Sequence, residues 1–174
     1  MAATFNWSKT CGDSGSPTIG DLGASGNLFN FMDEDTNTAA DYSTHPIVAS
    51  DTADQGNSYE IWIRAHFTDS FNKIDNIQFW QSTAFSPATG LTLKYKANNV
   101  GSYVTPVKTD STIATVTMPT ADPGTANVSI GGSLSGYLSS AGYSDYIVIQ
   151  LHCGTTCAAG DTSAAVFTAQ YDES

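Results

Sequence analysis

Four oxygen-bearing side chains lie close together in an acidic stretch near the N-terminus and could bind a hard cation. They are Asp33, Asp35, Asn37 and Asp41. Carboxylate and amide oxygens are the ligands that Ca²⁺ prefers. An EF-hand loop that began at Asp33 would need glycine at its sixth position and an acidic residue at its twelfth, and both positions carry threonine. The sequence therefore excludes an EF-hand and leaves two interpretations, a looser Ca²⁺ site or a solvated acidic loop, of which we favour the loop.

The segment Cys11–Pro17 places a serine in a glycine-rich run. Its sequence, CGDSGSP, resembles the segment around the nucleophile of trypsin-like serine proteases. That chemistry also needs a histidine base and an aspartate that orients it, and in that family both precede the serine. Here no histidine precedes Ser14. The sequence therefore excludes a protease of this order, and we interpret the segment as a turn.

The chain contains three cysteines, of which Cys153 and Cys157 are four positions apart while Cys11 is distant. A disulfide across the short loop is compatible with this spacing, and three reduced thiols are the alternative. A zinc site needs about four ligands, and the three histidines are scattered along the chain. The sequence predicts no zinc site and leaves the redox state of Cys153 and Cys157 open.

Four aromatic residues in the predicted strands could stack against a sugar ring. A carbohydrate-binding module would present such rings on a flat sheet surface. The same rings are also what a sandwich of this size needs to fill its core or to pack between subunits, and we favour this second interpretation. The four residues are Trp62, Trp80, Tyr95 and Tyr146.

Paired carboxylates would indicate a glycosidase, which needs two of them facing each other across a cleft. Glu60 and Asp75 are the only acidic residues set within the central predicted strands. Glu60 shares a face with Arg64, so we expect it to pair with that residue or with a neighbouring strand. The chain also lacks a phosphate-binding loop. The sequence therefore predicts a protein that is not an enzyme and needs no cofactor.

The residues from Ser58 to Ser82 show the strongest strand pattern. In 59–68, apolar residues at odd positions alternate with mostly polar residues at even positions, which is the period of a half-buried strand. Segment 73–82 is rich in β-branched and aromatic residues. The four residues 69–72 between them are typical of a hairpin connection. The sequence therefore predicts that these two strands pair antiparallel.

The rest of the chain reads as short strands joined by Gly- and Pro-rich turns, with no convincing amphipathic helix. About nine strands, the central pair included, predict a single all-β domain over 1–174, an antiparallel β-sandwich with the jelly roll as one variant. Residues 1–56 are expected to be partly irregular, with a long N-terminal loop over 10–26 and a role as an attachment arm. Segment 144–153 is apolar on both faces and is expected in mid-sheet. The remaining strands are predicted at 3–9, 27–32, 90–96, 112–118, 126–130 and 164–171, with an edge segment at 103–107.

The composition excludes several classes of partner. Charged residues make up 13% of the 174 residues, and the net charge is −11 with only six Lys and Arg. These six form no cluster, so we expect neither a nucleic-acid partner nor an anionic membrane. No run approaches the ~18 apolar residues of a membrane-spanning helix, and the N-terminus lacks the basic and apolar regions of a signal peptide.

Several stretches together resemble a loosely characterised family of virion proteins of tailed bacteriophages. These stretches are Asn57–Arg64, Ile74–Trp80, Tyr103–Pro106, Ser111–Ala114 and Ser144–Gln150. None of them is a catalytic motif. The resemblance implies a structural component of the virion, assembled in the host cytoplasm, whose partners are other virion proteins.

Within that class we expect a capsid decoration or cement protein that clamps neighbouring subunits of the major capsid protein, as a homo-oligomer such as a trimer. Such proteins stabilise a particle by burying surface between neighbours and need no cofactor. A position in the neck, tail or baseplate is one alternative. A carbohydrate-binding module for host attachment is the other.

Overall fold

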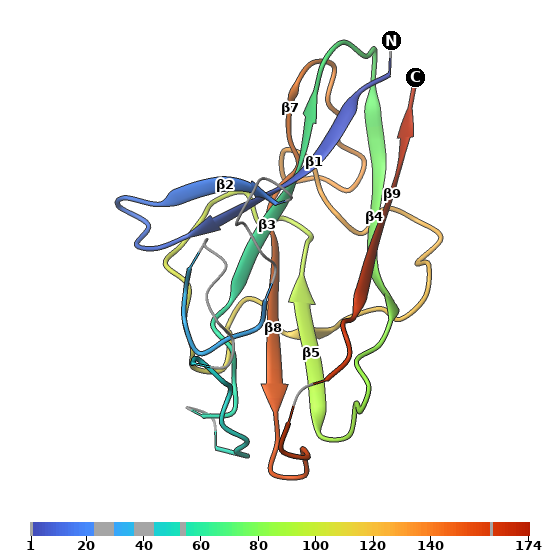
Figure 1. The fold of residues 1–174 in the computed structure, drawn as a ribbon. Coiled ribbons are helices and arrows are strands. Elements are labelled where there is room, and N and C mark those ends of the chain that lie inside the picture. Colours follow the sequence, from blue (N-terminus) through green and yellow to red (C-terminus); the bar gives the residue numbers. More distant parts are fainter. Residues whose placement is uncertain (1, 23–29, 37–43, 53–54, 161) are drawn as a thin grey trace.

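The computed structural model describes residues 2–22, 30–36, 44–52, 55–160 and 162–174 (Figure 1). Within these residues the chain forms nine strands in antiparallel sheets and no helix, so the all-β prediction is confirmed. No described part of the chain forms a helix that could cross a membrane.

The nine strands form two sheets of unequal size. In chain order they are β1 (Thr4–Cys11), β2 (Thr18–Leu22), β3 (Ile61–Thr68), β4 (Ile74–Thr83), β5 (Leu91–Lys96), β6 (Val116–Thr117), β7 (Gly142–Tyr143), β8 (Ile147–Cys153) and β9 (Val166–Glu173). The large sheet has the order β2-β1-β3-β8-β5-β6, with β7 also paired to β3, and the small sheet contains β4 and β9. Because β8 lies between β3 and β5, the predicted mid-sheet position of 144–153 is confirmed.

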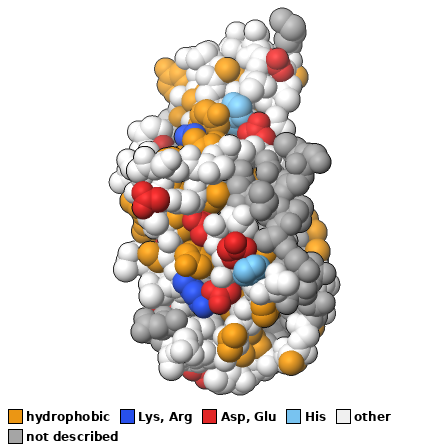
Figure 2. Space-filling view, turned by 60° about the vertical axis from the view of Figure 1, so that its left-hand side comes forward, with side chains coloured by type: hydrophobic (Ala, Val, Ile, Leu, Met, Phe, Trp, Pro, Cys, Tyr) orange, Lys and Arg blue, Asp and Glu red, His pale blue; other side chains and the backbone are white. Residues whose placement is uncertain are grey.

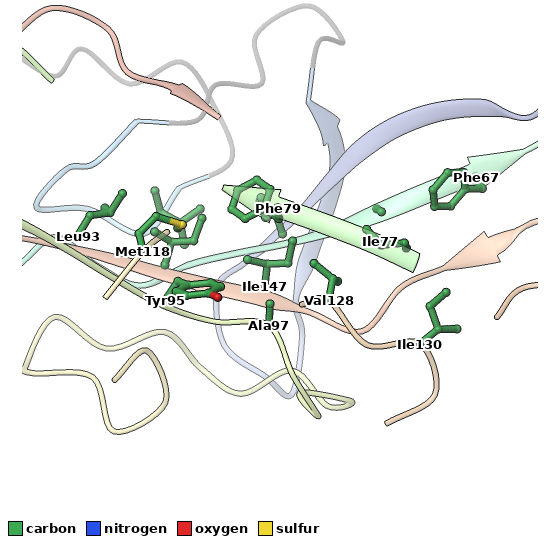
Figure 3. Packing of buried hydrophobic residues seen from close by; sticks show 14 of the residues in the cluster. Phe67, Ile77, Phe79, Leu93, Tyr95, Ala97, Met118, Val128, Ile130 and Ile147 are labelled. Carbon is green, nitrogen blue, oxygen red and sulfur yellow. The ribbon is translucent and has the colours of Figure 1, made fainter. Parts of the chain in front are cut away.

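The two sheets pack face to face around the main core (Figure 3). Phe67 and Ile147 of the large sheet and Ile77 and Phe79 of the small sheet are each at most 1% exposed. Burying a side chain of this size contributes about 1.5–3 kcal/mol to stability. The arrangement is an antiparallel β-sandwich. The jelly-roll variant is not confirmed, because a jelly roll divides eight strands between two sheets and here seven strands belong to one sheet.

The large sheet is covered on its outer face as well. There a second apolar cluster packs under the segment 97–115, which crosses the outside of β3 and β8. This cover explains why β8 is apolar on both faces, since neither face meets water. The buried members of this outer cluster are Trp62, Val100, Ala114, Tyr146 and Val148.

The predicted pairing of the two central strands is wrong. Both strands exist close to the predicted bounds, but β3 pairs with β1, β7 and β8, whereas β4 pairs with β9. Asp69 adopts a positive φ of 66° where the chain leaves β3 and crosses to the opposite sheet. The crossing lets the apolar faces of β3 and β4 oppose each other across the core. The alternation in 59–68 predicted the core-facing side of β3 correctly, but alternation does not identify the neighbour in the sheet.

The expected irregular N-terminal loop is also only partly correct. Within it, Thr18–Leu22 forms β2, which pairs with β1 from Trp7↔Leu22 to Cys11↔Thr18. Figure 1 shows this β1–β2 hairpin extending to one side of the sandwich, away from the small sheet. Residues 4–22 are therefore part of the large sheet.

Four predicted strands are shorter than expected or are not strands in their described residues. In two of them, side chains or single backbone hydrogen bonds outside a ladder satisfy the backbone amides. Within 112–118 only Val116–Thr117 is a strand, since the Ser111 hydroxyl accepts the amide hydrogens of Ile113 and Ala114. In 126–130 two amides donate to the Ile77 carbonyl without forming a ladder. Neither 103–107 nor the described part of 27–32, residues 30–32, is a strand.

Candidate functional site

A cleft opens between the two sheets at one end of the sandwich, where β8 ends and where β5 and β9 begin. This is the lower end in Figure 1. Its volume is about 450 Å³ and most of its lining is apolar. Phe31 packs against Phe85 and Phe167, with ring centroids 5.9 and 6.4 Å apart. These three rings come from distant parts of the chain. Sequence patterns therefore gave no signal for the cleft.

Two thiols, those of Cys153 and Cys157, line the same cleft. Both cysteines are free in the structure, and their side chains are hydrogen-bonded to each other. Burial, followed by this hydrogen bond, raises the pKa of the Cys153 thiol to about 12. The pair that the spacing singled out is thus brought together. Cys11 is buried at the end of β1 and does not line the cleft.

Backbone and side-chain hydrogen bonds fix the turn that carries these thiols. Cys153 donates its amide hydrogen to the Gly56 carbonyl at 2.7 Å, and its own carbonyl accepts from the Ser50 amide at 2.9 Å. The Asp51 carboxylate accepts from the hydroxyl and the amide of Thr155, and these bonds lower the pKa of Asp51. The turn is therefore held at its start and in its middle.

Gly90 allows the turn to pack directly on the start of β5. Its φ is +77°, and a Cβ atom there would lie 2.6 Å from the Cys157 amide nitrogen and 2.8 Å from the Cys157 sulfur. The Gly154 amide donates to the Gly90 carbonyl at 2.9 Å. Only glycine combines this backbone conformation with so close an approach.

Two of the four candidate Ca²⁺ ligands, Asp33 and Asp35, are described by the structure, and both carboxylates interact with other residues of the protein. Asp33 forms an ion pair with Lys108. The Asp35 carboxylate accepts the Gly12 amide hydrogen at 2.6 Å, and burial raises its pKa. The other two candidates, Asn37 and Asp41, lie outside the described residues. Among the described residues, no group of three or more His, Cys, Asp or Glu side chains is arranged to hold a metal ion.

Lys9 lies beside this stretch on β1 and is only 4% exposed. Its ammonium group donates to the Thr36 carbonyl, and burial lowers its pKa although Cys11 and Asp35 act in the opposite direction. The strand pattern gave no indication of a buried lysine here. We interpret Lys9 as the residue that fastens the acidic stretch to the large sheet.

The four aromatic residues that could have formed a sugar-binding platform are all buried. Trp62 and Tyr146 are 0% and 7% exposed and contact each other in the outer cluster, with ring centroids 5.5 Å apart. Tyr95, 9% exposed, belongs to the main core, and Trp80, also 9% exposed, lies on β4 in the other sheet. These residues therefore offer no common open surface to a sugar ring.

Ser14 lies in the turn of the β1–β2 hairpin, where the Ser16 amide donates to the Asp13 carbonyl at 2.9 Å. Its hydroxyl accepts from the Thr105 hydroxyl at 3.1 Å, and its amide donates to the same Thr105 oxygen. The interpretation of this segment as a turn is confirmed.

Glu60 is buried and does not pair with Arg64 as expected. Its carboxylate accepts from the Ser111 hydroxyl and, at 3.2 Å, from the Trp62 indole nitrogen. Arg64 instead lies with its guanidinium 3.8 Å from the centre of the Tyr143 ring. Asp75, on the other sheet, pairs with Lys73. The two central carboxylates therefore do not face each other across a common site.

His66 completes a polar aromatic stack on the outer face near β7. Its ring lies flat on the Tyr143 ring at 4.2 Å, on a tyrosine that also contacts Arg64. The sequence alternation placed Arg64 and His66 on one face of β3. It could not identify Tyr143, which reaches them from the far end of the chain.

Fold and side-chain arrangement together define an all-β sandwich protein with an apolar cleft and a thiol pair at one end. Comparisons of the chain with protein-family models, with curated proteins and with solved structures found no match.

Proposed function

We propose that this chain is a non-enzymatic structural protein of a bacteriophage particle that decorates the capsid and clamps neighbouring subunits. The observation that carries the proposal is the strand β2 at one edge of the large sheet. An edge strand offers backbone donors and acceptors to an extended segment of another chain. The opposite edge is formed by β6, which has only two residues. The contact is therefore expected at β2.

The side chains of β2 support a contact with another protein. Ile19 is 51% exposed on this strand, and Thr18 beside it is exposed as well. Among the described strands β2 has a neighbour on one side only, and an exposed apolar side chain next to such an edge favours strand addition by a partner. The β1–β2 hairpin also extends to the side of the sandwich, where a neighbouring subunit can reach it (Figure 1).

The surface chemistry supports the same class. Figure 2 shows a face on which charged side chains are few, with opposite charges side by side in small groups, and most of the described atoms on this face are uncharged. The net charge of −11 favours a partner with a basic surface. Among the described residues, Ser14 lies in a turn and hydrogen-bonds Thr105, and the Glu60 and Asp75 carboxylates do not face each other, so neither supports a hydrolase.

The direct test is an image of the particle. Cryo-electron microscopy of purified phage particles, with this chain tagged at its C-terminus, is expected to show it on the outer capsid surface between subunits. A location at the neck, tail or baseplate would replace the decoration role with the alternative virion role. Absence of the chain from purified particles would overturn the proposal.

We expect Ile19→Asp to weaken binding to particles assembled without this chain by about tenfold or more, because a charge replaces the exposed apolar contact of β2. Co-sedimentation with such particles measures the apparent affinity. Val48→Asp is the matched control, since Val48 is 66% exposed but lies outside every strand. Equal binding by the wild type and Ile19→Asp would contradict a contact at this edge.

A further inference from the structure

We propose that Cys153 and Cys157 form a reversible disulfide that locks the turn at the wall of the apolar cleft. The two side chains already contact each other, and both line the cleft. This inference concerns the chemistry of the thiol pair and is independent of the proposed virion role.

The backbone geometry carries the proposal. The Cys157 amide donates to the Gly154 carbonyl at 3.0 Å, so the chain reverses between the two cysteines. The start of the turn is fixed through Gly56 and Ser50, and its end packs on Gly90. Because the turn is already folded with its side chains in contact, oxidation needs only a small movement of the two side chains.

A low-molecular-weight disulfide such as glutathione disulfide can serve as the oxidant. The thiolate of one of the two cysteines attacks one of its sulfurs, the sulfur–sulfur bond breaks, and one glutathione leaves as a thiolate. The thiolate of the other cysteine then attacks the protein sulfur of the mixed disulfide and releases the second glutathione. The two protein thiols lose two protons and two electrons in all, and glutathione disulfide is reduced to two glutathione thiols.

Burial and the hydrogen bond with Cys157 raise the pKa of the Cys153 thiol to about 12, so the exchange is expected to accelerate as the pH rises.

Locking the turn changes the protein locally. Cys153 to Cys157 span five residues, and closing so short a loop raises the equilibrium constant for folding by about thirtyfold in the chain-entropy description. The effect on motion is expected at residues 154–157, the turn that ends at the cleft-lining Cys157 and packs on Gly90. Oxidation should slow hydrogen exchange of the Gly154 and Cys157 amides by about tenfold.

The test uses the full chain equilibrated in glutathione buffers of increasing oxidised fraction, quenched with N-ethylmaleimide and analysed by peptide mass spectrometry. We expect a disulfide peptide that links Cys153 to Cys157, full reversal with excess reduced glutathione, and an alkylated Cys11 after denaturation. Slower exchange of the 154–157 amides in the oxidised protein is the second readout. Absence of the link at the most oxidising ratio, or a link that includes Cys11, would overturn the proposal.

Three single substitutions separate the steps. Cys153→Ser is expected to stop at the mixed disulfide, with one glutathione attached to Cys157. Cys157→Ser is expected to stop at the mixed disulfide as well, with one glutathione attached to Cys153. Cys11→Ser is the matched control and should form the disulfide as the wild type does. A mixed disulfide that persists in the wild type, as it does in the two single variants, would contradict closure between Cys153 and Cys157.

Discussion

Trp62→Ala is expected to lower the free energy of unfolding by about 3–5 kcal/mol, the usual cost of removing a buried tryptophan. Trp62 is fully buried in the outer cluster. Its ring contacts Tyr103 and Tyr146 edge-on at 5.3 and 5.5 Å, and such aromatic pairs add to the energy of burial. Urea unfolding of the variant and the wild type measures the difference.

Tyr137→Ala is the control for this experiment. Tyr137 is 59% exposed, so its removal should change stability by at most about 0.5 kcal/mol. A loss of less than about 1 kcal/mol for Trp62→Ala would contradict the packing of the outer layer, because a cavity of this size is costly in any well-packed site.

Glu60→Ala is expected to lower the free energy of unfolding by about 3 kcal/mol. Glu60 is 3% exposed, and its carboxylate accepts hydrogen bonds from the Ser111 hydroxyl and the Trp62 indole. Hydrogen bonds to a charged group contribute about 1.5–3 kcal/mol each, and a donor left without a partner in a buried site adds its own desolvation cost. Urea unfolding again measures the change.

Glu60→Gln distinguishes the contribution of the Glu60 hydrogen bonds from that of its packing. The amide keeps the size of the side chain and one acceptor oxygen, so the expected loss is about half that of Glu60→Ala. Hydrogen exchange should also show faster opening of Ile113 and Ala114, whose amides donate to the Ser111 hydroxyl. Equal stability of Glu60→Ala and the wild type would show that this carboxylate does not hold the outer segment.

These two sites explain how an antiparallel sheet of this protein is covered on both faces. The Glu60 carboxylate fastens the outer segment at Ser111, and Gln150 fastens it again through the Thr109 carbonyl at 2.8 Å and the Ser111 amide at 2.9 Å. Trp62 then fills the space beneath. Glu60, next to the start of β3, and Trp62, in β3, therefore hold the outer segment 97–115 against the large sheet.

The failed hairpin prediction shows which information an alternating pattern carries. The alternation in 59–68 identified the face of β3 that meets the core, because a strand turns successive side chains to opposite sides. It could not indicate that 73–82 belongs to the other sheet, since a strand has the same alternation whichever neighbour it pairs with. That decision depends on contacts with β9, whose residues are almost one hundred positions away.

The candidate sites also depend partly on local sequence and partly on contacts between distant segments. The spacing of Cys153 and Cys157 left a disulfide open but did not decide it, because a turn between them brings the thiols together whereas an extended chain would hold the two Cα atoms roughly 13 Å apart. The cleft around them depends on Phe31, Phe85 and Phe167, which only the closed sandwich brings into contact.

The sequence by itself determined the all-β class and the core-facing side of β3, since each depends on residues close together in the chain. The tertiary structure alone decided the sheet partners, the burial of the four aromatic residues and the cleft. Each of these depends on distant segments that meet only when the two sheets and the outer segment pack. The sugar-binding platform fails for the same reason, because Trp62 and Tyr146 are buried in the outer cluster, Tyr95 in the main core and Trp80 on β4 of the other sheet.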